Sequence, residues 1–169
     1  MLIYLIGFMG SGKTTAGKKL ARKLAYDFID LDALIELETE LTISEFFNQF
    51  GEDKFRQTEQ QALRKTFELK NTVISTGGGA PCFFSNMDEI NKNGASVYLK
   101  SDIDLIINRL QGKKKQRPLI KDKSEEEFRA YINKLLAERE VYYSKAKLIV
   151  DAKSLNIEQL KSKIIELEY

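Results

Sequence analysis

The stretch Gly7-Phe8-Met9-Gly10-Ser11-Gly12-Lys13-Thr14 follows directly on the apolar run Leu2–Ile6. It matches the pattern G-x-x-x-x-G-K-[ST] in its expected setting, a glycine-rich loop between a buried strand and a helix. Glycines let the backbone curl until its N–H groups point inward at an anion, and the helix N-terminus adds partial positive charge. We therefore expect a phosphate-binding loop in which Lys13 reaches the β- and γ-phosphates and Thr14 ligates Mg²⁺. A glycine-rich turn that only connects strand to helix is the less favoured alternative.

Apolar runs and amphipathic segments alternate from one end of the chain to the other, which predicts an α/β fold with a five-stranded parallel sheet. The expected strands are 2–6, 26–31, 71–75, 96–100 and 147–150. The expected helices are 13–25, a helical stretch over 33–70, a helix that starts near 101, and helices over 124–143 and 156–167. Because no repeat, linker or low-complexity tract interrupts this pattern, we expect one domain over residues 1–169.

Composition excludes several classes of chemistry. The 169 residues include 27 Lys and Arg against 25 Asp and Glu, a balance that does not indicate nucleic-acid binding. The chain has no histidine, which excludes a Ser-His-Asp triad, a histidine base and histidine metal ligands. Its single cysteine, Cys82, excludes an internal disulfide and a cysteine-cluster zinc site. No apolar run approaches the roughly 18–20 residues of a membrane helix, and no signal peptide is recognisable. We expect a cytoplasmic protein that binds neither nucleic acid nor membranes.

Two acidic residues, Asp30 and Asp32, follow the second expected strand. The later apolar runs 72–76 and 97–100 carry no acid of the kind that holds a metal in many ATPases. In an extended segment, residues i and i+2 point the same way, so both carboxylates are expected at the carboxyl ends of the strands, where ligands bind. A solvated turn in which Asp32 caps a helix remains the alternative.

Three further segments are candidates for a second substrate. Arg56 and Glu59 lie three residues apart on one helical face, which by itself favours a surface ion pair. The glycines Gly77–Gly79 cost ordering entropy after a buried strand, which indicates a backbone that passes close to a ligand. Residues 111–124 hold a lysine run and Arg117, for which a solvated charge run is the plain alternative. The absence of interleaved aromatic residues argues against nucleic-acid binding. Facing a phosphate-binding loop, such a cationic loop would supply an arginine that neutralises phosphate charge.

Taken together, these segments resemble the shikimate kinase family. The resemblance extends over essentially the whole chain, in the family's order and spacing, and rests on Gly10–Thr15, Asp30-Leu31-Asp32, Phe55-Arg56 with Glu59, Gly77–Gly79, Arg117-Pro118-Leu119, and Arg139 with Tyr143. It implies a phosphate-binding-loop kinase fold, a three-layer α/β sandwich with strand order 2-3-1-4-5, a substrate-binding helical segment at 33–70 and a lid at 111–124. The implied reaction is transfer of the γ-phosphoryl group of ATP to the 3-hydroxyl of shikimate.

The resemblance also implies a role for each candidate residue. Lys13, Asp32 and Arg117 would be catalytic, with Asp32 binding and polarising the shikimate hydroxyls. Thr14 would hold Mg²⁺ directly and Asp30 through water, and Glu59 would support the site from behind. ATP would be bound by Gly10, Ser11, Gly12, Lys13, Thr14, Thr15, Arg109 and Arg117. Shikimate would be bound by Asp32, Arg56, Gly77, Gly78, Gly79 and Arg139. The only partners expected are these small molecules, and the protein is expected to be a monomer.

The chain departs from the family pattern at the expected adenine site. Arg109 is shifted by one position relative to Arg117, and the loop 151–157 has no proline, so Ile157 is left in its place. Two alternative functions also stay open from the sequence. One is another small-metabolite kinase, for example a gluconate or nucleotide kinase, and the other is a non-catalytic nucleotide-binding regulatory module.

Overall fold

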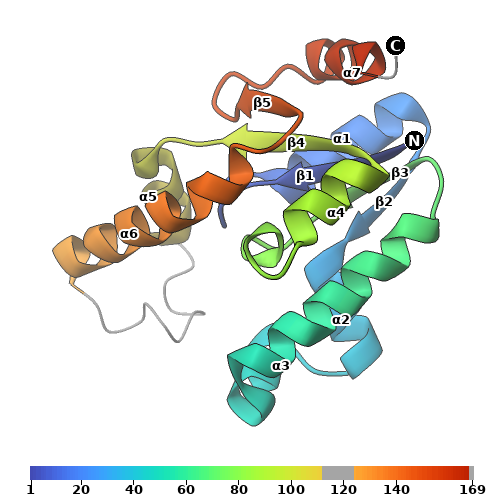
Figure 1. Ribbon diagram of the computed structural model, residues 1–169. Coiled ribbons are helices and arrows are strands. Elements are labelled where there is room, and N and C mark those ends of the chain that lie inside the picture. Colours follow the sequence, from blue (N-terminus) through green and yellow to red (C-terminus); the bar gives the residue numbers. More distant parts are fainter. Residues whose placement is uncertain (112–123, 168–169) are drawn as a thin grey trace.

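The computed structural model describes residues 1–111 and 124–167, and these form a parallel sheet with helices on both faces (Figure 1). The strands are β1 (Leu2–Ile6), β2 (Asp27–Asp30), β3 (Thr72–Ser75), β4 (Ala95–Lys100) and β5 (Leu148–Asp151). The helices are α1 (Lys13–Leu24), α2 (Leu31–Thr39), α3 (Ile43–Lys65), α4 (Asn86–Asn93), α5 (Ile103–Gln111), α6 (Glu125–Tyr143) and α7 (Ile157–Glu166), with 3₁₀ turns at Thr66–Glu68 and Ala80–Cys82.

The sheet has the strand order β2-β3-β1-β4-β5, and every neighbouring pair is parallel. This confirms the predicted fold class and strand order. β1 lies in the centre, where it pairs with β3 on one side and with β4 on the other. The loop that follows β1 therefore leaves the sheet at the point where the strand order reverses, which is where ligands bind in open α/β sheets.

Alternating side chains of β1 build two separate cores. Tyr4 and Ile6 point into a cluster shared with α2 to α6, whereas Ile3 and Leu5 point into a cluster shared with α1 and α7. Figure 1 shows the same division, with α1 and α7 on one side of the sheet and α4 and α6 on the other. A strand buried on both faces reads as a continuous apolar run, and this explains the sequence of residues 2–6.

The helical stretch expected over 33–70 is two helices, not one. α2 begins earlier, at Leu31, and ends at Thr39, and α3 begins after a capping box in which Thr42 and Glu45 satisfy each other's backbone N–H groups. α3 is itself interrupted at Gly51, whose φ of 79° is not helical. In Figure 1 the two helices extend together beyond the edge of the sheet.

The sequence analysis missed one helix, α4. Its eight residues follow directly on an irregular segment, and their amphipathic pattern is short, with Met87 and Ile90 buried. Among the described residues, no helix has the length and apolar character needed to cross a membrane.

Candidate active site

The loop between β1 and α1 has the backbone of an anion-binding site. Gly12 precedes α1 with φ of 95°, a left-handed conformation that glycine adopts without strain, and no side chain caps the N-terminus of this helix. Ser11 N–H donates to the carbonyl of Phe8 at 3.2 Å, which closes the loop on itself. Of the predicted loop residues, Ser11 and Lys13 are buried, Gly10 and Gly12 are partly exposed, and Thr14 and Thr15 are exposed.

Lys13 is held inside this loop by the loop's own carbonyls. Its Nζ donates to the oxygens of Gly7 and Phe8, each at 2.9 Å, and the residue is 8% exposed. These bonds place a positive charge beside the loop before any ligand arrives. Next to it in sequence, Thr14 Oγ1 donates to Asp30 Oδ2 at 2.7 Å, so a hydroxyl from α1 and a carboxylate from the end of β2 lie side by side.

Arg109 brings the end of α5 onto the same loop. Its Nη1 donates to the carbonyl of Gly10 at 2.8 Å, across 99 positions of sequence, and a methyl group built at Gly12 would lie 3.3 Å from the same nitrogen. The residue predicted near the nucleotide therefore does contact the phosphate-binding loop, although the sequence placed it one position out of the family register.

The geometry predicted for Asp30 and Asp32 was wrong in one respect. Only Asp30 is in an extended segment, where it ends β2 and caps α2 by accepting a hydrogen bond from the N–H of Ala33 at 3.4 Å. Asp32 lies in the first turn of α2, so the two side chains are not related by a strand's two-residue period. The cap that the alternative interpretation assigned to Asp32 is thus provided by Asp30, and Asp32 is left for other contacts.

The turn Gly77–Gly79 brings the remaining candidates together. A methyl group built at Gly77 would lie 2.7 Å from Oδ1 of Asp32 and 2.7 Å from Oε1 of Glu59. One built at Gly78 would lie 3.2 Å from Nη1 of Arg139 and 3.2 Å from the backbone N of Met9 in the phosphate-binding loop. Side chains at these positions would collide with the elements that approach this stretch of backbone, so glycines are needed here. The sequence analysis expected close approach of a ligand, and that part stays a prediction.

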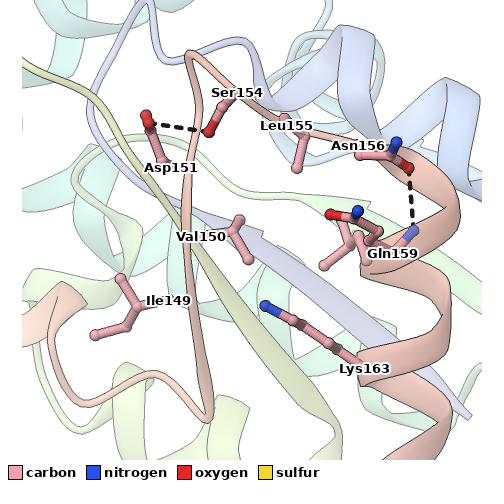
Figure 2. Close-up of a pocket in the computed structure, with 9 residues that line it drawn as sticks. Ile149, Val150, Asp151, Ser154, Leu155, Asn156, Gln159 and Lys163 are labelled. Atoms are coloured by element: carbon pink, nitrogen blue, oxygen red, sulfur yellow. Dashed lines mark hydrogen bonds between the residues drawn. The ribbon is translucent and has the colours of Figure 1, made fainter.

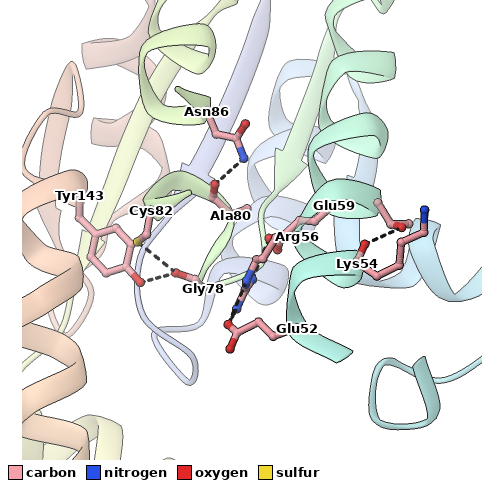
Figure 3. Close-up of polar contacts among 10 residues, drawn as sticks. Glu52, Lys54, Arg56, Glu59, Gly78, Ala80, Cys82, Asn86 and Tyr143 are labelled. Atoms are coloured by element: carbon pink, nitrogen blue, oxygen red, sulfur yellow. Dashed lines mark hydrogen bonds and ion pairs between the residues drawn. The ribbon is translucent and has the colours of Figure 1, made fainter. Parts of the chain in front are cut away.

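Arg56 and Glu59 are not the surface ion pair that their spacing favours. Arg56 is 8% exposed and Glu59 1% exposed, and their Nη1 and Oε2 atoms are 2.8 Å apart. The guanidinium also donates to Glu52 from Nε and Nη2, at 3.3 and 3.1 Å (Figure 3). Its carbon lies 4.2 Å from the ring centroid of Phe83. The guanidinium is thus fixed in position, and its flat face packs where a side chain at Gly79 would otherwise be.

Sequence reasoning missed two of these partners, Glu52 and Phe83. Glu52 is one helical turn before Arg56, so the spacing i, i+4 was available as a signal. Phe83 follows the glycine turn in an irregular segment, where no periodic pattern predicts which way a side chain points.

Arg139 reaches the turn from the opposite side, on α6. Its guanidinium carbon lies 5.5 Å from the ring centroid of Phe8, so it is placed between the phosphate-binding loop and Gly78. Two guanidinium groups, from α3 and α6, therefore flank one glycine turn. Planar guanidinium forks are suited to binding a carboxylate through paired hydrogen bonds.

Burial changes the acid–base character of the two carboxyl groups over Gly77. Burial and the charge of Asp30 raise the pKa of Asp32 above its ordinary value, and the positive charges of Lys13 and Arg56 oppose this shift. Burial likewise raises the pKa of Glu59, against the lowering effect of Arg56. A carboxylate with a raised pKa is a stronger proton acceptor than an exposed one.

The loop expected to contact adenine lies beside a separate hollow. This hollow, of about 170 Å³, lies between β5 and α7 and is lined by residues from Ile149 to Lys163 (Figure 2). Asp151 accepts hydrogen bonds from Lys153 N and Ser154 Oγ, and Asn156 caps α7, so the polar groups of this loop largely satisfy one another. Ile157 is the first residue of α7 and packs against the α1–α7 core. Arg117 and most of the segment 111–124 lie outside the described residues.

Comparisons with known proteins agree with this geometry. Residues 9–168 match the sequence profile of the family described as shikimate kinase. A shikimate kinase of Azobacteroides pseudotrichonymphae is 46% identical over 167 residues, which cover 96% of this chain and 98% of that protein. The crystal structure of shikimate kinase from Bacteroides thetaiotaomicron aligns with a TM-score of 0.90 at 41% identity, covering 99% of this chain and 98% of that one. Shikimate kinase from Acinetobacter baumannii in complex with shikimate aligns with a TM-score of 0.86 at 34% identity, covering 99% and 92%.

Proposed function

The chain belongs to the shikimate kinase family, and we propose that the residues gathered around the phosphate-binding loop and Gly77–Gly79 carry out its reaction. The enzyme transfers the γ-phosphoryl group of ATP to the 3-hydroxyl of shikimate. The observation that carries the assignment of residues is the meeting of two kinds of site. A loop built for phosphate lies against a turn flanked by two arginines and by two carboxyl groups, of which Glu59 is buried and Asp32 half-buried.

The ATP end of the site is built from the loop, Lys13 and two arginines. Gly10, Ser11 and Gly12 would offer backbone N–H groups to the phosphates, and Thr14 and Thr15 continue this surface into the helix N-terminus. Lys13 is already held beside the loop, so its charge meets the β- and γ-phosphates with little reorganisation. Arg109 would contact the nucleotide next to Gly10, and the family resemblance supports Arg117 on the transferring phosphate.

The residues at Thr14 and Asp30 suit a magnesium ion. Mg²⁺ prefers oxygen ligands and is usually held by one or two protein groups together with phosphate oxygens and waters. The adjoining Thr14 hydroxyl and Asp30 carboxylate provide such a pair, with Thr14 as direct ligand and Asp30 acting through water. The bound ion would neutralise charge that develops on the transferring phosphate. Within residues 1–111 and 124–167 there is no cluster of three acidic or cysteine side chains that would form a different metal site.

Asp32 would bind the shikimate hydroxyls and accept the proton of the attacking one. Its raised pKa favours this role, and its position over Gly77 puts it between the loop and the arginines. Phosphoryl transfer proceeds through a loose transition state, so positioning and charge neutralisation supply most of the catalysis and a carboxylate is a sufficient base.

Arg56 and Arg139 would bind the shikimate carboxylate, and the backbone of Gly77–Gly79 would close this end of the site. Glu59 would hold Arg56 in place from its buried side. Binding of the shikimate carboxylate between these two guanidinium groups would fix the orientation of the shikimate ring. That orientation decides which hydroxyl of shikimate faces the γ-phosphate of ATP. We also propose that residues 33–70 form the shikimate-binding segment, that 111–124 act as the lid, and that the enzyme is a cytoplasmic monomer. Light scattering during gel filtration tests the monomer.

A coupled assay of ADP release tests the proposal directly. Shikimate, quinate, gluconate and nucleoside monophosphates are offered in parallel with ATP, with and without Mg²⁺. We expect fast turnover with shikimate only, and only with the metal. Comparable turnover with gluconate or a nucleotide would favour the alternative kinases, and no turnover with any acceptor would favour a regulatory module.

A further inference from the structure

Tyr143, the last residue of α6, is a buried phenol whose hydroxyl reaches the glycine turn. The residue is 0% exposed, and its ring lies 5.1 Å from that of Tyr98, centroid to centroid. Its hydroxyl donates to the carbonyl of Gly78 at 2.5 Å, and the thiol of Cys82 faces the same carbonyl at 4.0 Å (Figure 3). The side chain therefore does more than fill the core, because its hydroxyl, its only polar group, donates a hydrogen bond to the Gly78 peptide.

That hydrogen bond decides how the Gly78–Gly79 peptide is oriented. In a trans peptide the carbonyl and the following N–H point in opposite directions, so holding the Gly78 oxygen toward Tyr143 turns the Gly79 N–H away from it. Among the described residues, no backbone carbonyl accepts a hydrogen bond from this N–H. In Figure 3, Tyr143 and Arg56 lie on opposite sides of the turn. Glycine peptides have no side chain to restrict their rotation, so an external anchor is needed to fix one orientation.

Tyr143 also lies beside Arg139. The two residues are separated by one helical turn on α6 and therefore share a face. The positive charge of Arg139 opposes the strong upward shift that burial imposes on the pKa of Tyr143. The same guanidinium lies beside Gly78 and over the ring of Phe8. The phenol that donates to the Gly78 carbonyl is therefore on the same face of α6 as the guanidinium that lies beside Gly78.

We propose that Tyr143 is a positioning residue for the acid end of shikimate. It does not touch the substrate, and it holds the Gly78–Gly79 peptide and the Arg139 guanidinium in the relative positions that bind the carboxylate. This inference rests on the proposed role of Arg139 and the glycine turn. It adds that the buried Tyr143 orients Arg139 and the glycine turn. A core residue that does not touch shikimate would then influence the affinity for shikimate.

The test is Tyr143→Phe, which keeps the ring and removes only the hydroxyl. We expect KM for shikimate to rise about 10-fold, equivalent to about 1.4 kcal/mol at 25 °C. kcat and KM for ATP should change less than twofold, because neither Lys13 nor Asp32 depends on this hydrogen bond. An unchanged KM for shikimate in a folded variant would overturn the proposal.

Tyr4→Phe is the matched control. The Tyr4 hydroxyl also makes a buried hydrogen bond, with Thr66 Oγ1 at 2.9 Å, but Thr66 lies in the 3₁₀ turn Thr66–Glu68 and not in the glycine turn or α6. Both variants should lose similar thermal stability, and only Tyr143→Phe should lose shikimate affinity. If both raise KM for shikimate equally, the effect is loss of core order, and Tyr143 has no positioning role.

A second ligand separates a positioning role from general damage. The primary amide of shikimate lacks the acid, so Tyr143→Phe should weaken its binding less than twofold while weakening shikimate about 10-fold, as measured by calorimetry. Equal weakening of both ligands would contradict the inference. Arg139→Met is measured alongside: if it binds shikimate as the wild type does, the acid-end assignment itself is wrong, whereas if it loses affinity and Tyr143→Phe does not, only the inference fails.

Discussion

Asp32 is the side chain proposed to accept the proton of the attacking hydroxyl, and this role makes a specific prediction. Asp32→Asn keeps the shape and the hydrogen-bonding reach of the residue but cannot accept a proton. We expect kcat for ADP release to fall by roughly 100- to 10,000-fold, the usual contribution of a positioned acid–base group. KM for ATP should change little. An unchanged kcat would show that Asp32 only begins a helix.

The pH profile gives an independent check on the same residue. Asp32 must be ionised to act, and burial raises its pKa above the ordinary 3.8, so activity should be lost on acidification at a higher pH than for an exposed aspartate. The residual activity of Asp32→Asn should lack this acid limb. The carboxyl group of shikimate titrates identically for both proteins, so an acid limb that persists unchanged in the variant would assign it to the substrate.

We expect removal of Arg56 to change two measured quantities, the affinity for shikimate and the free energy of unfolding. Arg56→Met alone leaves a buried carboxyl group without its partner, and breaking such a pair costs about 3–5 kcal/mol. The double variant Arg56→Met/Glu59→Gln leaves no buried charge, so it should regain much of that stability in urea unfolding. Both variants should bind shikimate about 10- to 150-fold more weakly, from the loss of a charge-assisted contact of roughly 1.5–3 kcal/mol. Wild-type shikimate affinity in the double variant would remove Arg56 from the site.

At this scale the sequence predicted the form of the phosphate-binding loop better than it predicted the surroundings of the other candidate residues. The pattern Gly7–Thr14 carries its own geometry, because glycine spacing and the adjoining helix determine the site locally. Arg56 and Glu59 carried no such signal. Their burial depends on Phe83 and on the turn at Gly79, twenty or more positions further along the chain, and a helical spacing cannot reveal contacts made by another element.

At the scale of elements, the turn between β3 and α4 leaves no space for a side chain at Gly79. Gly79 has φ of −88°, a backbone that alanine adopts without strain, so Gly79→Ala changes only the space beside it. A methyl group there would overlap the Arg56 guanidinium, which is already held by Glu52, Glu59 and Phe83. We expect shikimate binding to weaken at least 10-fold in calorimetry, with nucleotide binding and far-UV circular dichroism unchanged. Unimpaired shikimate binding would mean that the guanidinium can move aside freely.

Element boundaries followed local chemistry where that chemistry was strong. The strand 2–6 was recognised from its continuous apolar run alone. Asp32 was predicted in an extended segment, but Asp30, two residues earlier, caps α2. The helix therefore begins at Leu31, and Asp32 lies inside it while Asp30 stays at the end of β2. α4 was missed because only two of its eight residues, Met87 and Ile90, mark a buried apolar face.

For the whole molecule, the site is assembled from parts of chain that meet only in the fold. The loop after β1, the starts of α1 and α2, the middle of α3, the turn after β3, and the ends of α5 and α6 each contribute at least one group. Ligand binding is therefore linked to global unfolding. A ligand that binds only the native state stabilises it by RT ln(1 + [L]/Kd), where [L] is the free ligand concentration.

This linkage gives the last prediction, measured by thermal unfolding. Shikimate at 100 times its Kd should stabilise the fold by about 2.7 kcal/mol, which for a domain of this size raises Tm by roughly 5–10 °C. ADP with Mg²⁺ should raise Tm independently, through the phosphate-binding loop. In Arg139→Met, the shift with shikimate at the same concentration should nearly disappear while the shift with ADP persists, because Arg139 lies beside Gly78 whereas Lys13 is held by the carbonyls of Gly7 and Phe8. Equal loss of both shifts would mean that Arg139 serves the phosphates, and that the acid of shikimate depends on Arg56 alone.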